Sequence, residues 1–111
     1  MTDPVDLTNL HEMTDNDKVL EEALFQEFFI AADETIKTLE ANCVEDANEP
    51  WRSAAHALKG VAYNLGAIAL GDLCKKAQDG YAAGIAEKRE LLQAIQAAYT
   101  ESKLFLENVH H

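Results

Sequence analysis

The sequence is poor in basic residues, in glycine and in proline. Lys and Arg number 9 against 20 Asp and Glu, so the formal net charge is −11. Because Lys and Arg supply the affinity for phosphate backbones and anionic lipids, this balance argues against nucleic acid and membrane surfaces as partners. Only five Gly and two Pro interrupt the 111 residues. The long stretches between them are rich in Ala, Leu, Glu, Lys and Gln, which favours helices.

Cysteine and long apolar runs are scarce as well. Cys43 and Cys74 form no C-x-x-C pair and have no histidine nearby at the spacing of zinc ligands. We expect two free, partly buried thiols, and a disulfide between them stays open at this point. No apolar run approaches the roughly 20 residues that span a bilayer. Residues 1–10 lack the charged and apolar regions of a signal peptide, so we expect a cytoplasmic protein.

Hydrophobic periodicity predicts helices over residues 6–13, 17–42, 50–65, 67–82 and 86–107. The breaks between them are short and contain Asp, Asn, Pro or Gly, and no stretch alternates as a strand does. We therefore predict an all-α fold, an antiparallel up-down four-helix bundle with a short additional N-terminal helix. The chain should form a single domain over residues 1–111, with its core within residues 6–107.

The core-facing side of each long helix follows from apolar residues at helical spacing. In the helix over 17–42 this row is Leu20, Leu24, Phe28, Ala31, Thr35 and Leu39, widened by Phe25, Phe29 and Ile36. In the helix over 67–82 it is Leu70, Leu73, Ala77 and Tyr81, with Gln78 at the edge. In the last helix the residues expected to face mostly inward are Leu91, Leu92, Ile95, Ala98, Leu104 and Phe105.

Residues 51–66, WRSAAHALKGVAYNLG, contain the informative histidine. Their apolar stripe is centred on Leu58 and comprises Trp51, Ala54, Ala55, Leu58, Val61, Ala62 and Leu65. At about 100° per residue, His56 falls roughly 160° from the centre of this stripe. It shares the outer half of the helix with Arg52, Ser53, Gly60 and Tyr63. His56 is therefore predicted to project into solvent from the middle of a helix, whereas the terminal His110 and His111 are assigned no function.

Two neighbours distinguish His56 from an ordinary exposed histidine. Gly60 follows one turn later on the same face, although glycine inside a helix costs roughly 1 kcal/mol relative to alanine. Side chains lean toward the helix N-terminus, so a side chain at position 60 would lean over His56. Lys59 lies on the flank and can place an ammonium beside a group attached to the ring. A nucleophilic imidazole, cleared space and an adjacent cation indicate a phosphoryl-acceptor site.

These residues give the chain a family resemblance. His56-Ala57-Leu58-Lys59-Gly60, followed by Asn64-Leu65-Gly66-Ala67, resembles the histidine-containing phosphotransfer (HPt) domain family. The family pattern is H-x-L-K-G on a helix that continues to a turn of small residues. The resemblance extends from around Asp6 to Gly84 and more weakly through the last helix. It implies a four-helix bundle that relays phosphoryl groups in a multistep two-component phosphorelay.

The resemblance also implies a role for each site residue. The family's histidine accepts the phosphoryl group, usually on Nε2, so His56 would be the acceptor. A lysine matching Lys59 neutralises the phosphoryl charge, and a glutamine such as Gln78 often lies beside the histidine. The open space that Gly60 leaves above the ring, argued from helix geometry, fits these roles. The implied partners are receiver domains of response regulators or a hybrid sensor kinase.

The same resemblance implies a monomeric phosphoryl carrier without autonomous catalytic activity. The divalent metal of the transfer step is expected on the receiver, so the chain should need no cofactor or metal of its own. It has no P-loop, nucleotide loop or kinase signature and should not use ATP. Candidates for the partner surface are Leu10, Met13, Phe25 and Phe29, with core packing the stronger expectation for the two phenylalanines.

Two other functions compete with this interpretation. A non-catalytic helical adaptor would bind a signalling partner through its bundle face and form no phosphohistidine, but it leaves Lys59 and Gly60 unexplained. A metal-binding four-helix bundle enzyme would use inward-facing Glu and His side chains, whereas His56 is predicted to face outward.

Overall fold

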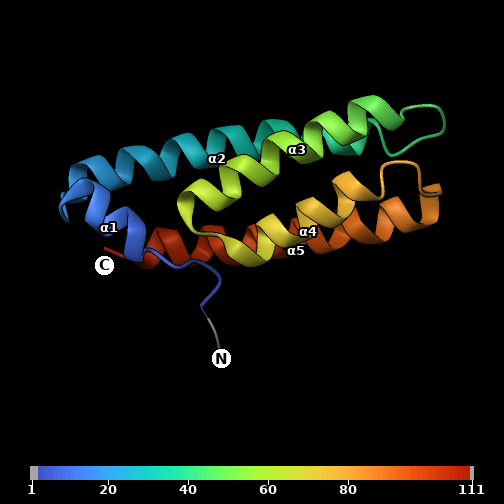
Figure 1. Cartoon of the computed structure of the whole chain (residues 1–111). Coiled ribbons are helices and arrows are strands. Elements are labelled where there is room, and N and C mark those ends of the chain that lie inside the picture. The colour runs from blue at the N-terminus through green and yellow to red at the C-terminus, as the bar shows by residue number, and fades with distance from the viewer. Residues whose placement is uncertain (1–2, 111) are drawn as a thin grey trace.

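Five α-helices make up most of the chain. The computed structural model describes residues 3–110, and His111 and the first two residues lie outside this range. The helices are α1 (Thr8–Thr14), α2 (Lys18–Ala41), α3 (Asn48–Leu65), α4 (Ile68–Asp79) and α5 (Ile85–Asn108) (Figure 1). No strand occurs within the described range, so the predicted all-α fold is confirmed.

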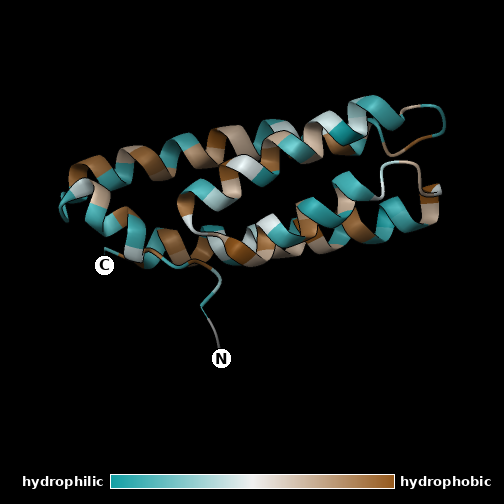
Figure 2. Cartoon of the chain, viewed as in Figure 1, coloured by the Kyte–Doolittle hydropathy of each residue, from teal (hydrophilic) through white to brown (hydrophobic). Residues whose placement is uncertain are grey.

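The four long helices pack side by side in chain order. Each contacts the next, α5 also contacts α2, and α1 packs on α2. Figure 1 shows successive long helices running in opposite directions, with α1 crossing one end of the assembly. Figure 2 shows hydrophobic and hydrophilic residues alternating along each helix, as expected for helices with one buried face. Within residues 3–110, no helix is long and apolar enough to cross a membrane.

The helix boundaries differ from the sequence-based expectation by up to three residues. α1 begins at Thr8 instead of Asp6. α3 begins at Asn48 and includes Pro50 in its first turn, where the missing N–H is not needed. α4 ends at Asp79, with its last helical hydrogen bond running from the N–H of Gly80 to the carbonyl of Lys76, and Tyr81 and Ala82 follow in a turn. Asp17 caps the start of α2, accepting hydrogen bonds from the N–H groups of Val19 and Leu20.

The buried face of α2 is rotated from the predicted row. The buried apolar residues are Phe25, Phe28, Phe29, Ala32, Ile36 and Leu39. Within the predicted row Phe28 and Leu39 are buried, whereas Leu20 is 44% exposed and Leu24, Ala31 and Thr35 are only partly buried at the edge of the core. The helix carries apolar residues on two adjacent rows, and contacts with α3 and α5 determine which row is buried.

The prediction for Leu104 on α5 is wrong, since this side chain is 56% exposed. Ser102 is buried instead, with its hydroxyl donating to the carbonyl of Ala98 at 2.9 Å. This bond satisfies the hydroxyl within the helix and allows Ser102 to face the core, which turns Leu104 to the opposite side. On α4 the predicted Leu73 is half-buried and Cys74 is fully buried.

The turn between α3 and α4 fixes how these helices face each other. Gly66 has a φ of +98°, and its carbonyl accepts a hydrogen bond from the N–H of Asp6 at 2.8 Å. A Cβ on Gly66 would overlap the carbonyl of Asp6, so both backbone shape and space require glycine. Next to the turn, the hydroxyl of Tyr63 donates to Asp72 at 2.6 Å. The ring of Tyr63 lies against Gly71.

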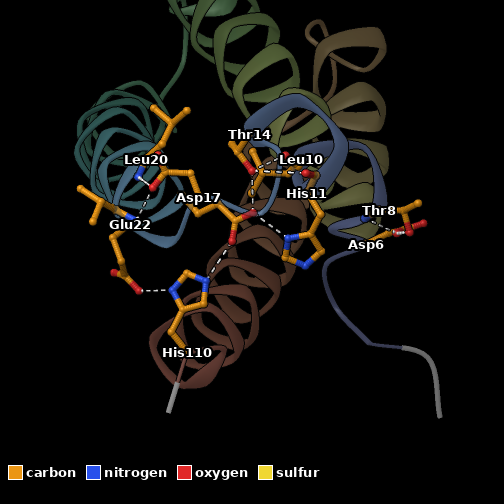
Figure 3. A network of polar contacts seen from close by, with 11 residues as sticks. Asp6, Thr8, Leu10, His11, Thr14, Asp17, Leu20, Glu22 and His110 are labelled. Atoms are coloured by element: carbon orange, nitrogen blue, oxygen red, sulfur yellow. Dashed lines mark hydrogen bonds and ion pairs between the residues drawn. The ribbon is translucent and has the colours of Figure 1, made fainter.

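A buried carboxylate joins α1, α2 and the end of α5. Glu21 is 1% exposed, and its Oε2 accepts a hydrogen bond from Thr14 at 2.7 Å. His11 Nδ1 lies 2.7 Å from the same oxygen, and His110 Nε2 lies 2.9 Å from Oε1. The other ring nitrogen of His110 bonds to Glu22 (Figure 3). These contacts stabilise the position of α1 on the bundle.

Both cysteines are free thiols, as expected. Cys43 is partly buried and Cys74 is buried in the core. Burial raises the pKa of Cys74 to about 12, so this thiol stays protonated and unreactive at neutral pH.

Candidate functional site

His56 lies in the middle of α3 and is exposed, as predicted. The buried residues of the helix are Trp51, Ala54, Ala55, Leu58, Ala62 and Leu65. Val61, the remaining member of the predicted stripe, is half-buried. The imidazole therefore projects from the face of α3 that points away from the core.

A shallow pocket of about 330 Å³ lies beside the ring, lined by Arg52, Ser53, His56 and Gln78. The structure thus brings the predicted Gln78 of α4 next to His56 of α3. Gln78 is partly buried, and its Oε1 is the buried side-chain oxygen without a hydrogen-bond partner among the described residues. An unpartnered buried acceptor is unusual in a protein and marks a place where a donor would be stabilised.

Contacts between α3 and α4 hold the two sides of this pocket together. The indole Nε1 of Trp51 donates to the backbone carbonyl of Ala77 at 2.9 Å, one residue before Gln78. The guanidinium of Arg52 lies over the ring of Tyr81, with Cζ 5.2 Å from the ring centroid. Arg52 also approaches Glu49 at 3.9 Å, a distance and exposure at which an ion pair is weak.

Gly60 is exposed on the same side of α3, one turn beyond His56. A Cβ placed on Gly60 would meet nothing within 4 Å. Internal packing therefore does not require this glycine, in contrast to Gly71, where a Cβ would overlap the ring of Tyr63. A side chain at position 60 would occupy open space on the same side of α3 as the imidazole.

Lys59 is half-buried on the flank of α3. It lies outside the pocket that contains His56 and Gln78, and no ion pair involves it within residues 3–110. Its ammonium remains available to an anion on the C-terminal side of the ring.

Sequence reasoning placed Arg52 and Ser53 on the outer half of the helix but gave them no role. Their spacing of four and three residues before His56 was the signal that could have found them.

An apolar groove lies between α1, α2 and α3, with a volume of about 490 Å³. Its lining consists of Leu10, Met13, Leu24, Glu27, Phe28, Ala31, Val61, Asn64 and Leu65. Met13 is 70% exposed at its rim. The candidate docking residues Phe25 and Phe29 are both buried in the core, which agrees with the packing role expected for them.

Within the described range, no group of three or more His, Cys, Asp or Glu side chains is arranged to hold a metal ion. The chain has one Glu-x-x-His spacing, Glu107 with His110, at the end of α5. There His110 is hydrogen-bonded to Glu21 and Glu22.

Comparison with known families decides the identity of the chain. A family model described as Hpt domain matches residues 23–104. The chain belongs to the Hpt domain family. Hpt domains take part in phosphotransfer in two-component signalling. The match runs from α2 into α5 and includes His56, Lys59, Gly60 and Gln78, while α1 lies outside it. No curated protein and no solved structure matches the chain in the same comparisons.

Proposed function

We propose that this protein is a phosphorelay intermediate that carries a phosphoryl group on His56 between aspartates of receiver domains. One observation supports the proposal above the others. His56 is exposed in the middle of a bundle helix and lines one pocket with Gln78, whose buried amide oxygen has no hydrogen-bond partner among the described residues. A histidine in this place can meet a partner's active site without any rearrangement of the core.

The transfer step uses the imidazole as a nucleophile. A ring nitrogen of neutral His56, Nε2 in the family, attacks the phosphorus of a receiver phospho-aspartate. The bond between phosphorus and the aspartyl oxygen breaks, and the carboxylate leaves with the bonding electron pair. Oε1 of Gln78, which has no partner among the described residues, would accept a hydrogen bond from the other ring nitrogen during transfer, keeping the proton there and leaving Nε2 free to react. The receiver supplies the divalent metal and most of the charge stabilisation.

The remaining site residues support this step from the carrier's side. Lys59 neutralises part of the charge of the bound phosphoryl group. Gly60 leaves room for the receiver above the ring. The reverse reaction passes the group to a second receiver, so the protein acts as a carrier without catalytic activity of its own.

The apolar groove is the proposed docking surface for the receiver. Asn64, which belongs to the groove and is exposed, follows His56 by eight residues on α3 and lies about 80° around the helix from it. Eight residues of helix span about 12 Å, so one partner can cover both features. Met13 and Leu20, exposed on α1 and α2, extend the apolar surface. We further propose that the whole chain is one Hpt domain, monomeric and cytoplasmic, in which α1 completes this surface.

Substitution of His56 tests the proposal. The full chain is incubated with a phosphorylated receiver domain, and acid-labile label on the protein is measured. The wild type should be labelled, and His56→Gln should take up no label while keeping the wild-type helix content. Gln93→Ala, at an exposed position of α5 away from the pocket and the groove, serves as the control and should be labelled like the wild type. Label on His56→Gln would overturn the assignment, and a receiver that binds without labelling the wild type would indicate an adaptor.

A further inference from the structure

Among the described residues, Arg52 is the one Lys or Arg that lines the pocket beside His56. It precedes His56 by one helical turn on the outer half of α3. Because helical side chains lean toward the N-terminus, the imidazole leans toward the turn that carries Arg52 and Ser53. A group attached to the ring on this side would therefore enter the pocket that the guanidinium faces.

The contacts of Arg52 leave its donors available. The guanidinium lies over the face of Tyr81, and such stacking leaves the N–H groups at the edge free to bind an anion. Its pair with Glu49 is long and solvent-exposed, with side-chain exposures of 50% and 72%. An ion pair of this kind stabilises by little and is readily exchanged for a phosphoryl group. Tyr81 thus orients the cation without neutralising it.

The charge of the whole protein makes this cation significant. With a net charge of −11, the chain as a whole repels a phosphoryl dianion, so attraction at the site must be local. Lys59 supplies a positive charge one turn after His56, outside the pocket. Arg52 supplies one a turn before it, inside the pocket, and its planar fork matches phosphoryl oxygens in a way that an ammonium does not.

We propose that Arg52, oriented by Tyr81, binds the phosphoryl group on His56, with the Ser53 hydroxyl as a second donor. The proposal rests on the function proposed above and adds a second cation to it. Phosphohistidine is then held from both sides, by Lys59 toward the C-terminus of α3 and by Arg52 toward its N-terminus. Arg52 acts on the phosphoryl group itself, and Tyr81 is a positioning residue.

The test follows phosphorylation of the full chain by phosphoramidate, which needs no receiver, and the ionisation of the phosphoryl group by ³¹P NMR. A nearby guanidinium favours the dianion, so Arg52→Ala should raise the apparent pKa of the phosphoryl group by about half a unit. The rate of labelling should fall about five- to tenfold, the effect of losing one charge-assisted hydrogen bond. Arg52→Lys should recover part of both effects.

Matched variants distinguish the loss of phosphoryl binding from the effect of changing the net charge and from the effect of destabilising the fold. Lys37→Ala also removes one positive charge, but Lys37 lies in the groove between α2 and α5, so both readouts should stay at wild-type values. Tyr81→Phe keeps the ring beneath the guanidinium and should also match the wild type, whereas Tyr81→Leu should shift both readouts in the direction of Arg52→Ala. Arg52→Ala, Arg52→Lys and Lys37→Ala should unfold at the wild-type midpoint, since the side chains of Arg52 and Lys37 are exposed. Tyr81→Leu should unfold at a lower midpoint, because Tyr81 is partly buried against the core, and its two readouts are therefore compared with those of Tyr81→Phe.

The outcomes distinguish this proposal from the one on which it rests. If the wild type is labelled on His56 and Arg52→Ala behaves like Lys37→Ala, the role of Arg52 is overturned and the carrier function stands. If neither phosphoramidate nor a phosphorylated receiver labels His56 in the wild type, the carrier function fails and this proposal fails with it.

Discussion

The indole of Trp51 donates a hydrogen bond to the carbonyl of Ala77 across 2.9 Å, and this bond joins α3 to α4 beside the pocket of His56. Trp51 is fully buried, five residues before His56, and Ala77 immediately precedes Gln78. The bond fixes which residue of α4 faces the imidazole. A contact in the core thus sets the geometry of the exposed site.

Trp51→Phe should lower the free energy of unfolding by about 2–4 kcal/mol, because it removes a buried hydrogen bond and leaves a cavity. Urea denaturation measures the change. Thr100→Val is the control: it removes a hydroxyl on the exposed side of α5 that donates to the carbonyl of Gln96, and the effect should stay below about 0.5 kcal/mol. Equal stability of Trp51→Phe and the wild type would show that the bond contributes nothing.

Gly60→Ala should raise the free energy of unfolding by about 0.5–1 kcal/mol, since the added Cβ meets no neighbour and alanine favours the helix. The same change should slow phosphoryl transfer from a receiver, and Gly60→Glu should slow it further. The measurements are thermal unfolding and transfer kinetics on the same samples. Transfer by Gly60→Glu at the wild-type rate would contradict the open-face interpretation.

Gly71→Ala is the matched control on α4 and should act in the opposite direction. Its Cβ would overlap the ring of Tyr63, which is held by a hydrogen bond to Asp72. Overpacking of this kind lowers the free energy of unfolding by about 1–3 kcal/mol. The free energy of unfolding should therefore rise in Gly60→Ala and fall in Gly71→Ala. This difference would show that internal packing requires Gly71 but not Gly60.

The sequence was sufficient to predict the number of helices and the outward direction of His56. In α3 a single apolar stripe alternates with polar residues, so only one burial pattern fits. In α2 two adjacent rows are apolar, and the choice between Leu20 and Phe25 depends on where α3 and α5 pack. Ser102 was missed for a similar reason, because hydropathy does not reveal that its hydroxyl is satisfied within the helix.

The site was predictable only in the parts that belong to one helix. His56, Lys59 and Gly60 lie on α3, and helical spacing places them relative to one another. The position of Gln78 at the edge of α4 was also predicted from periodicity. Its meeting with Arg52 depends on how α3 and α4 are aligned, which the turn at Gly66 and the bond from Trp51 to Ala77 determine.

Glu21 should make stability depend on acid pH. Burial alone would raise its pKa, but hydrogen bonds from His11, Thr14 and His110 outweigh burial and lower the pKa from 4.5 to about 2. Its contribution to stability is therefore fully present above pH 4.5 and is lost as the pH falls from there toward 2. Urea denaturation across this range should show the wild type losing its advantage over Glu21→Gln. Glu101→Gln, an exposed control, should differ little from the wild type, and a constant gap between wild type and Glu21→Gln would contradict the prediction.

His110 should make the stability of the fold depend on pH in a higher range than Glu21 does. Hydrogen bonds to Glu22 and Glu21 raise its pKa above the ordinary 6.5, so protonated His110 stabilises the folded chain fully below pH 6.5. This contribution is lost as the pH rises through the raised pKa. His110→Phe keeps the stacking on Phe25, whose ring centroid lies 5.6 Å away, and removes the titrating group. The wild type should therefore lose stability with rising pH relative to His110→Phe, and NMR titration of the ring should give a pKa above 6.5. A measured pKa at or below that value would show that the two carboxylates do not hold the imidazolium in solution.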